Sequence, residues 1–108
     1  MALQSVTVRG VTREDFAEWE PLWKGYNRFY GRQHFPEKVT QMTWSRFFDA
    51  YEPVHALVTQ RADRLVGLVH YLFHRSTIQI EPTCYLQDLY TDETTRNQGV
   101  GRMLIEAV

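Results

Sequence analysis

The amino-acid sequence predicts a mixed α/β domain, and three observations carry that prediction. Segments with alternating or β-branched apolar residues, typical of strands, occur at the start of the chain and through its second half. Two segments between them carry aromatic residues at the three- or four-residue spacing of a helix. A glycine-containing turn followed by an amphipathic segment comes last. The expected order is strand, helix, helix, three strands and helix.

The first strand and the first helix are expected near the N-terminus. Residues 5–9 alternate polar and apolar side chains, and Thr12 with Asp15 three positions later predicts a helix start. Pro21 removes one backbone hydrogen bond, so we expect a kink or a break there. The apolar helical face, which we interpret as core, consists of Phe16, Trp19, Trp23, Tyr26 and Tyr30. Its last two members, Tyr26 and Tyr30, are candidates to reach a pocket rim.

A loop and a second helix are expected next. Gly31, His34 and Pro36 interrupt the helical periodicity, which predicts a loop over residues 31–42. Thr43 can cap a helix that ends before Pro53. Its apolar face consists of Trp44, Phe47, Phe48 and Tyr51.

Two strands joined by a tight turn follow this helix. Residues 54–60 and 65–73 carry strand patterns, and the polar turn 61–64 between them predicts a hairpin. Gly67 indicates a bulge or a close approach of neighbouring backbone.

The last strand and the last helix complete the expected fold. Residues 78–80 fit either a strand end or a loop, and residues 83–91 predict the fourth strand. The final helix is expected from Gly99 onward. Its buried face would consist of Val100, Met103, Leu104, Ala107 and Val108.

Composition and charge indicate a single globular domain over residues 1–108. Hydrophobic residues make up 44% of the 108 residues, enough for a core. The net charge of −1 and the lack of a basic run argue against a nucleic-acid partner. No signal peptide or membrane-length apolar stretch occurs, and the lone Cys84, expected to be buried, excludes an internal disulfide. We therefore expect a cytoplasmic protein without a membrane partner. The four histidines (His34, His55, His70 and His74) show no metal-ligand spacing, so no metal is expected.

The turn at residues 96–101 is the strongest functional signal. Gly99 and Gly101 permit a close backbone approach where a helix begins, and the first helical turn offers amides without intrahelical acceptors. Such a site attracts phosphate, and Arg96 and Arg102 flank it. Neither a P-loop nor a complete dinucleotide fingerprint is present. The alternative is a plain turn without a ligand.

The unit Arg96-Asn97-Gln98-Gly99-Val100-Gly101 resembles the Q/R-x-x-G-x-G/A signature of the GNAT family of N-acetyltransferases. Within that family the chain looks most like the branch of yeast histone/polyamine and diamine (spermidine/spermine) acetyltransferases, on the residues of segments 22–26, 67–73 and 85–91. The resemblance implies the acyl-coenzyme A N-acyltransferase fold, with a mixed, mostly antiparallel sheet flanked by helices. It also implies acetyl-coenzyme A as co-substrate and a primary amine as acceptor, in a polyamine, a small amino compound or a protein.

The resemblance assigns roles to individual residues. The turn Arg96, Asn97, Gln98, Gly99, Val100, Gly101 and Arg102 would hold the pyrophosphate, and Leu89, Tyr90 and Thr91 would pair with the pantetheine arm. An amide of Leu89 or Tyr90 would stabilise the oxyanion. Asp88 is the candidate proton-handling residue. Gln87 occupies the position of a catalytic glutamate in the diamine acetyltransferases, so it is a candidate substrate contact with Tyr26 and Tyr30 instead.

The chain stops at Val108 in the middle of the last predicted helix. The family continues with further strands and a helix, so we expect a C-terminally truncated domain, or one that a second copy or a partner chain completes. An apolar edge strand favours such association. We expect weak turnover by this chain alone. The alternatives to an enzyme are an acyl-coenzyme A sensor or interaction module, and a structural fragment without a ligand.

Overall fold

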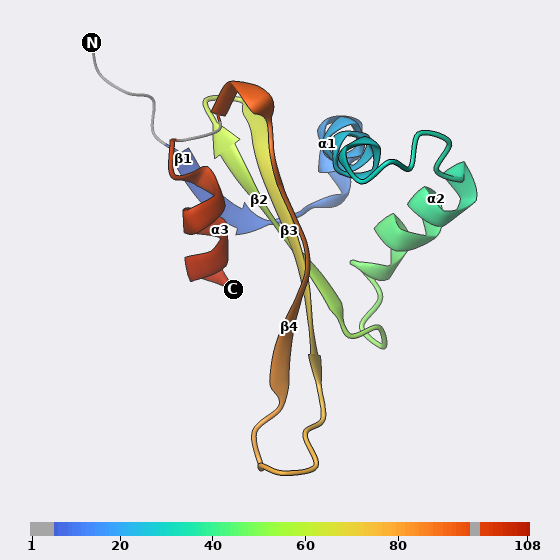
Figure 1. Ribbon diagram of the computed structural model, residues 1–108, viewed down its shortest axis with the longest axis vertical. Coiled ribbons are helices and arrows are strands. Elements are labelled where there is room, and N and C mark those ends of the chain that lie inside the picture. Colours follow the sequence, from blue (N-terminus) through green and yellow to red (C-terminus); the bar gives the residue numbers. More distant parts are fainter. Residues whose placement is uncertain (1–5, 96–97) are drawn as a thin grey trace.

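The computed structural model describes residues 6–95 and 98–108 and shows a mixed α/β fold in the predicted order (Figure 1). The strands are β1 (Val6–Gly10), β2 (Val54–Arg61), β3 (Arg64–His74) and β4 (Thr83–Thr91). They form one antiparallel sheet in the order β1-β2-β3-β4. The helices are α1 (Phe16–Phe29), α2 (Glu37–Arg46) and α3 (Val100–Ala107), with short 3₁₀ turns at Arg13–Asp15 and Glu93–Thr95. Within the described part of the chain, no helix is long and apolar enough to cross a lipid bilayer.

The helices cover both faces of the sheet, with α1 and α2 on one side and α3 on the other (Figure 1). The core on the α1 side is aromatic: Trp19, Trp23, Tyr26 and Trp44 pack against Val58 and Leu68. The core on the α3 side is aliphatic and consists of Val66, Val69, Val100 and Leu104. The alternating side chains of β3 therefore feed two cores of different character.

The start of α1 confirms the predicted acidic cap. The Thr12 amide donates to the Asp15 carboxylate at 2.7 Å, and the Arg9 guanidinium donates to both oxygens of the same carboxylate at 2.8 and 2.9 Å. We expected a kink or a break at Pro21; a break is wrong, because α1 continues through Pro21 to Phe29, and the kink stays a prediction. An interior proline removes one helical hydrogen bond and its ring crowds the carbonyl of the preceding turn, and the burial of the aromatic face offsets this cost.

The second helix differs from the prediction. It begins at Glu37 and ends at Arg46, so it occupies half of the segment predicted to be a loop. Pro36 stands at its N-cap, a position where an extended residue precedes the first helical turn. The buried residues Thr40 and Trp44 define its inner face. Because Thr40 is polar, the apolar residues of this segment do not show a helical period.

The β2–β3 hairpin confirms both readings of Gly67. Thr59 pairs with Gly67 and Gln60 with Leu65, so Val66 is an extra residue in a β-bulge. A side chain at Gly67 would lie 2.7 Å from the Thr59 hydroxyl and 3.2 Å from Leu104 of α3. The missing side chain therefore lets α3 pack closely on the sheet.

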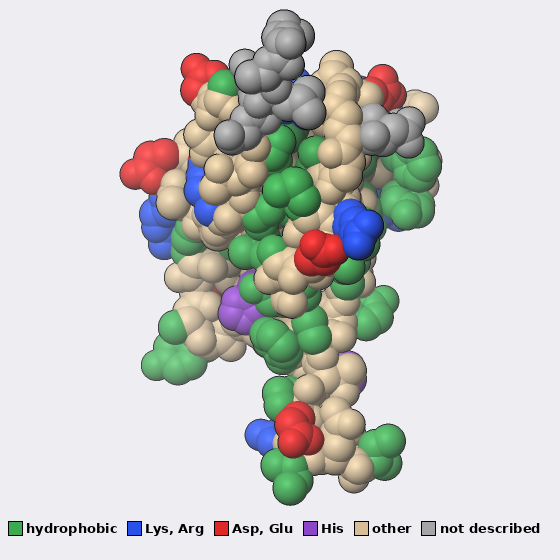
Figure 2. All heavy atoms as spheres, turned by 90° about the vertical axis from the view of Figure 1, so that its left-hand side faces the viewer, with side chains coloured by type: hydrophobic (Ala, Val, Ile, Leu, Met, Phe, Trp, Pro, Cys, Tyr) green, Lys and Arg blue, Asp and Glu red, His purple; other side chains and the backbone are tan. Residues whose placement is uncertain are grey.

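The far ends of β3 and β4 form an arm beyond the other strands (Figures 1 and 2). The connection over residues 75–82 is a loop, which resolves the open alternative for residues 78–80, and it leaves Ile78 and Ile80 92% and 88% exposed. Cys84, expected to be buried, is exposed at the base of this arm. On α3, Val100 and Leu104 are buried as predicted, whereas Ala107 and Val108 are exposed.

Candidate functional site

A β-bulge in β4 positions the candidate site. His70 of β3 pairs with Asp88, but the next residue, Tyr71, pairs with Leu86. Gln87 is therefore an extra residue, and it is exposed. The bulge reverses the alternation of side chains and turns Asp88 toward α1.

The backbone amides of β4 alternate between β3 and the outer edge of the sheet. Asp92, directly after the strand, donates its N–H to the Val66 carbonyl at 2.8 Å and thereby sets the phase of the ladder. Inward and outward N–H groups alternate in an antiparallel pair, so the amides of Leu89 and Thr91 face outward and that of Tyr90 faces inward. No described strand pairs with this edge, since the sheet ends at β4.

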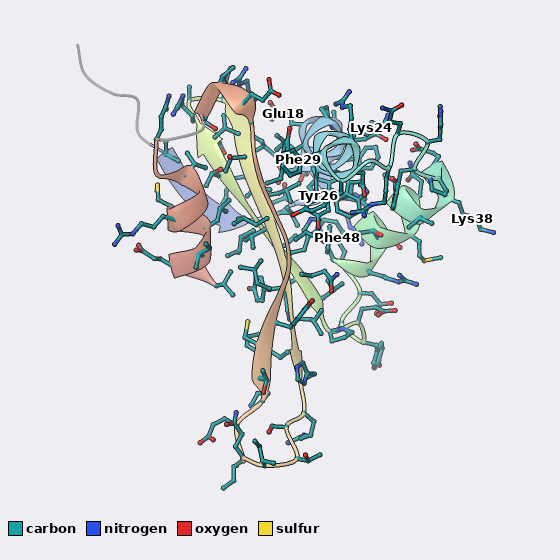
Figure 3. The ribbon with its side chains drawn as sticks, viewed as in Figure 1. Glu18, Lys24, Tyr26, Phe29, Lys38 and Phe48 are labelled. Atoms are coloured by element: carbon teal, nitrogen blue, oxygen red, sulfur yellow. The ribbon has the colours of Figure 1, made fainter. Side chains whose placement is uncertain are left out.

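A cavity of about 380 Å³ lies between the C-terminal end of α1, β4 and the start of α3. It brings together several predicted residues that are distant in sequence: Tyr26, Tyr30, Leu89, Tyr90, Thr91 and Gly101. Phe29 also lines it, and Figure 3 shows Tyr26 and Phe29 extending from α1 on the sheet side. Gly25 makes room for this arrangement, because a side chain there would lie 2.6 Å from the Tyr90 hydroxyl.

The start of α3 is open for an anion. Gly99, the N-cap, has a left-handed φ of 80°, which glycine adopts without strain. A side chain at Gly99 would meet nothing within 4 Å, and one at Gly101 would meet only Thr91, at 3.8 Å. Val100 and Leu104 pack against Val66 and Val69 of β3 and hold the helix on the sheet. None of the described carbonyls accepts the first-turn amides of Val100, Gly101 or Arg102, so the residues present fit a phosphate group.

The β2–β3 turn supports the segment that leads to α3. Arg61 donates to the Gln98 side-chain amide oxygen, and Arg64 donates to the Thr94 hydroxyl at 3.2 Å. Arg102 pairs with Glu106 on the exposed side of the helix at 2.8 Å. The predicted contacts Arg96 and Asn97 lie outside the described residues.

A buried series of hydrogen-bonded polar groups, absent from the sequence-based predictions, ends at Asp88. The Trp19 indole N–H donates to His70 Nε2 at 3.1 Å, and His70 Nδ1 lies 2.9 Å from Asp88 Oδ2. Because Nε2 accepts a hydrogen bond, Nδ1 carries the proton and donates it to the carboxylate. Burial lowers the pKa of His70 despite the neighbouring Asp88, and the imidazole stays neutral. The hydrogen bonds from Trp19 to His70 and from His70 to Asp88 thus fix the orientation of the Asp88 carboxylate.

Tyr26 connects these hydrogen-bonded residues to the cavity. It lines the cavity, and burial together with its hydrogen bond to Asp88 raises the pKa of its hydroxyl. The tyrosine therefore remains protonated and available as a donor to Asp88. The site combines an outward amide edge, an open helix start and a buried carboxylate reached through a hydroxyl. These groups can hold an anion and accept a proton.

The sequence and the fold match known acetyltransferases. The family described as acetyltransferase (GNAT) matches residues 18–108. The D-amino-acid N-acetyltransferase of Saccharomyces cerevisiae is 34% identical over 111 residues, which cover 100% of this chain and 68% of the relative.

Two solved structures share the fold. An aminoglycoside N-acetyltransferase in complex with coenzyme A superposes with a TM-score of 0.82 at 14% identity, covering 98% of this chain and 68% of the other. The ribosomal-protein-alanine N-acetyltransferase of Brucella melitensis gives a TM-score of 0.76 at 17% identity, covering 95% and 68%.

Proposed function

This chain belongs to the acetyltransferase (GNAT) family, and from that premise we propose that it transfers an acetyl group from acetyl-coenzyme A to the primary amine of a small amino compound. The predicted family and fold are thereby confirmed. The observation that supports the detailed proposal is the open start of α3 beside the outward amides of β4.

The co-substrate would lie along the β4 edge. The outward carbonyl of Leu89 and the outward backbone groups of Thr91 would pair with the pantetheine arm as an added strand does. The amides at Gly99, Val100, Gly101 and Arg102 would hold the pyrophosphate, with Arg96, Asn97 and Gln98 as further contacts. Bound acetyl-coenzyme A supplies an activated acyl carbon. The Leu89 amide is the donor that would stabilise charge on its carbonyl oxygen.

Asp88 would take the proton that the amine releases. The amine nitrogen would form a bond to the acyl carbon as the carbon–sulfur bond breaks, coenzyme A would leave as its thiolate with the electron pair of that bond, and one proton would leave the nitrogen. Tyr26 lines the cavity and is hydrogen-bonded to Asp88, so its hydroxyl would accept this proton while passing its own to the carboxylate. His70 would act as a positioning residue, because it holds Asp88 without facing the cavity. Tyr30 and Gln87 remain proposed contacts of the acceptor.

Calorimetric titration with acetyl-coenzyme A tests the co-substrate site, with Gly101→Val as the variant. The valine would project toward Thr91 into the cavity, and we expect binding to weaken at least about tenfold. Gly10→Val, at a site with nothing within 4 Å, is the control that should bind as the parent does. Unchanged affinity in Gly101→Val would remove the proposed site.

An acetyl-transfer assay with small amines and lysine peptides separates an enzyme from a sensor. Both would bind acetyl-coenzyme A, but only an enzyme consumes it. Binding of acetyl-coenzyme A without acetyl transfer would contradict the proposed reaction.

A further inference from the structure

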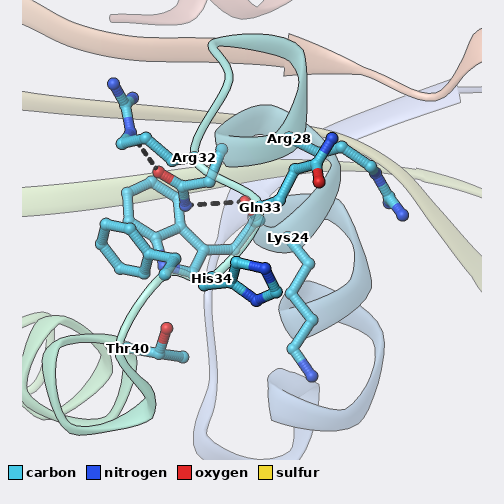
Figure 4. Close-up of a pocket in the computed structure, with 9 residues that line it drawn as sticks. Lys24, Arg28, Arg32, Gln33, His34 and Thr40 are labelled. Carbon is cyan, nitrogen blue, oxygen red and sulfur yellow. Dashed lines mark hydrogen bonds between the residues drawn. The ribbon is translucent and has the colours of Figure 1, made fainter.

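A second cavity, of about 470 Å³, lies at the loop that follows α1 (Figure 4). It is separate from the cavity at β4, with which it shares none of its described lining residues. Three cationic side chains line it, Lys24, Arg28 and Arg32, and none of the described lining residues carries a carboxylate. Glu20, which lies 3.8 Å from Lys24, is not among them. The lining charges therefore favour an anionic ligand.

Arg32 is held in place by a buried amide. Its Nε donates to the Asn27 side-chain oxygen at 2.9 Å, and the Asn27 side-chain nitrogen donates to the Trp23 carbonyl at 2.9 Å. Asn27 is only 2% exposed. The guanidinium carbon of Arg32 also lies 5.8 Å from the Tyr26 ring centre and 5.5 Å from that of Tyr30. A guanidinium fixed in this way binds an anion with little further loss of freedom.

Two buried polar groups of the lining have no hydrogen-bond partner within the described part of the chain. Trp23 is 6% exposed, and its indole Nε1–H is buried without an acceptor. Thr40 of α2 is 2% exposed, and Figure 4 shows its hydroxyl pointing from the helix toward the cavity. A buried donor without a partner destabilises the protein. A ligand rich in oxygen, directly or through a water that it holds, would supply the missing acceptor.

The donors of the lining suit a phosphate group better than a carboxylate. Guanidinium, ammonium and indole groups donate hydrogen bonds and accept none. A carboxylate offers two oxygens and one charge, whereas a phosphate monoester offers three terminal oxygens and a charge of about −1.5 to −2 at pH 7. The cavity has the size of a small-molecule site. The net charge of −1 argues against a membrane surface or a nucleic acid, since both bind to wide basic faces.

We infer that this cavity binds the phosphate group of a small phosphorylated molecule. The terminal nitrogens of Arg32 would donate to two phosphate oxygens, and Lys24 would contribute a second positive charge. Trp23 and Thr40 would donate at the buried end of the cavity. This binding site is additional to the proposed acetyl transfer and does not depend on it.

An NMR titration of the chain with inorganic phosphate at constant ionic strength tests the inference. The readout is the indole N–H signal of Trp23, which reports on this cavity alone. We expect a saturable shift in the parent, and an affinity at least about tenfold weaker in Arg32→Gln. Lys24→Gln, at a second exposed position, should weaken binding by a smaller factor, because Lys24 shares its charge with Glu20.

Two further ligands and a lipid surface distinguish the possible sources of the anion. Acetate should bind at least about tenfold more weakly than phosphate, because it has fewer oxygens and less charge. Glycerol 3-phosphate should bind at least as tightly as inorganic phosphate. Vesicles of phosphatidylglycerol should not carry the protein into the pellet on sedimentation.

Arg46→Gln is the matched control, since Arg46 ends α2, pairs loosely with Glu52 at 3.8 Å and lines neither cavity. It should bind phosphate as the parent does. The indole signals of Trp19 and Trp44, which line neither cavity, show whether each variant is folded.

Four results would overturn the inference. They are the absence of a saturable shift at Trp23, parental affinity in Arg32→Gln, equal affinity for acetate and phosphate, and sedimentation of the protein with the vesicles. The acetyl-coenzyme A titration concerns the cavity at β4, so each of these results leaves the proposed function to its own test.

Discussion

His70 shows how much a single buried side chain decides in this protein. It is 1% exposed, accepts from Trp19 and donates to Asp88, so it links the aromatic core to the candidate site. A neutral imidazole suits this place, because a buried imidazolium would leave the Trp19 indole facing a second donor.

The buried imidazole predicts a pH dependence of stability. The pKa of His70 lies below its ordinary value of 6.5 in the folded state, so the unfolded chain binds more protons as the pH falls below 6.5. The free energy of unfolding should therefore decrease below about pH 6.5 and be at its full value above it. Urea denaturation of the parent and of His70→Gln at several pH values measures this. The variant should lose that part of the slope.

His74→Gln is the control, because this histidine is exposed at the end of β3. It should keep the pH slope of the parent. An identical slope in His70→Gln would show that another group causes it. The lowered pKa of Asp15 gives a separate loss of stability at more acidic pH, below the ordinary value of 3.8.

At the scale of elements, a glycine in the middle of α1 needs an explanation, because glycine weakens a helix by about 1 kcal/mol relative to alanine. The explanation for Gly25 is steric, because the Tyr90 hydroxyl lies where a side chain of residue 25 would be. The helix gives up intrinsic stability so that β4 can approach it. The width of the cavity at β4 depends on that approach.

Gly25→Ala should therefore impair binding more than stability. The alanine displaces Tyr90, a ring that lines the cavity, and we expect the Kd for acetyl-coenzyme A to rise several-fold. The melting temperature should change little, since the gain in helix propensity offsets part of the strain. Calorimetric titration and thermal unfolding measure the two effects. Gly10→Ala should alter neither, and a Gly25→Ala protein with parental affinity would contradict this account.

Elements whose apolar residues recur at a clear spacing could be predicted from the sequence. Features that depend on contacts with residues distant in sequence could not. The fourth strand was predicted over residues 83–91, the bounds that β4 has, because its apolar run lies between turn residues. The first half of α2 was missed, because its inner face includes the buried Thr40. His70 and Asp88 pair across a bulge that no alternation reveals. A histidine in the middle of a fully apolar strand was the available signal for a buried partner.

At the scale of the molecule, the arrangement around β4 joins all parts of the candidate site. The strand contributes the outward amides and the buried carboxylate, α1 the aromatic wall and α3 the open helix start. The expectation that a second copy or a partner chain completes the sheet remains a prediction. Its structural basis is the position of β4 at the end of the strand order.

Light scattering after size-exclusion chromatography measures that association. We expect the apparent mass to rise with concentration toward about twice that of the monomer, because an apolar edge strand pairs readily. Tyr85→Lys, on the exposed part of β4, should shift the protein toward the monomer. Tyr51→Lys, at a tyrosine that is 98% exposed and lies outside the sheet, should not. A monomer at all concentrations would contradict the prediction.

The extra residue at Gln87 gives β4 two halves whose side chains are out of phase. In the half toward the arm, odd-numbered and even-numbered positions face opposite ways from those near α3. Loss of that one residue would therefore not act locally. It would move every side chain from Asp88 to Thr91 to the opposite face of the sheet, or else shift the pairing register of the arm with β3. This strand therefore tolerates a change of residue type far better than a change of length.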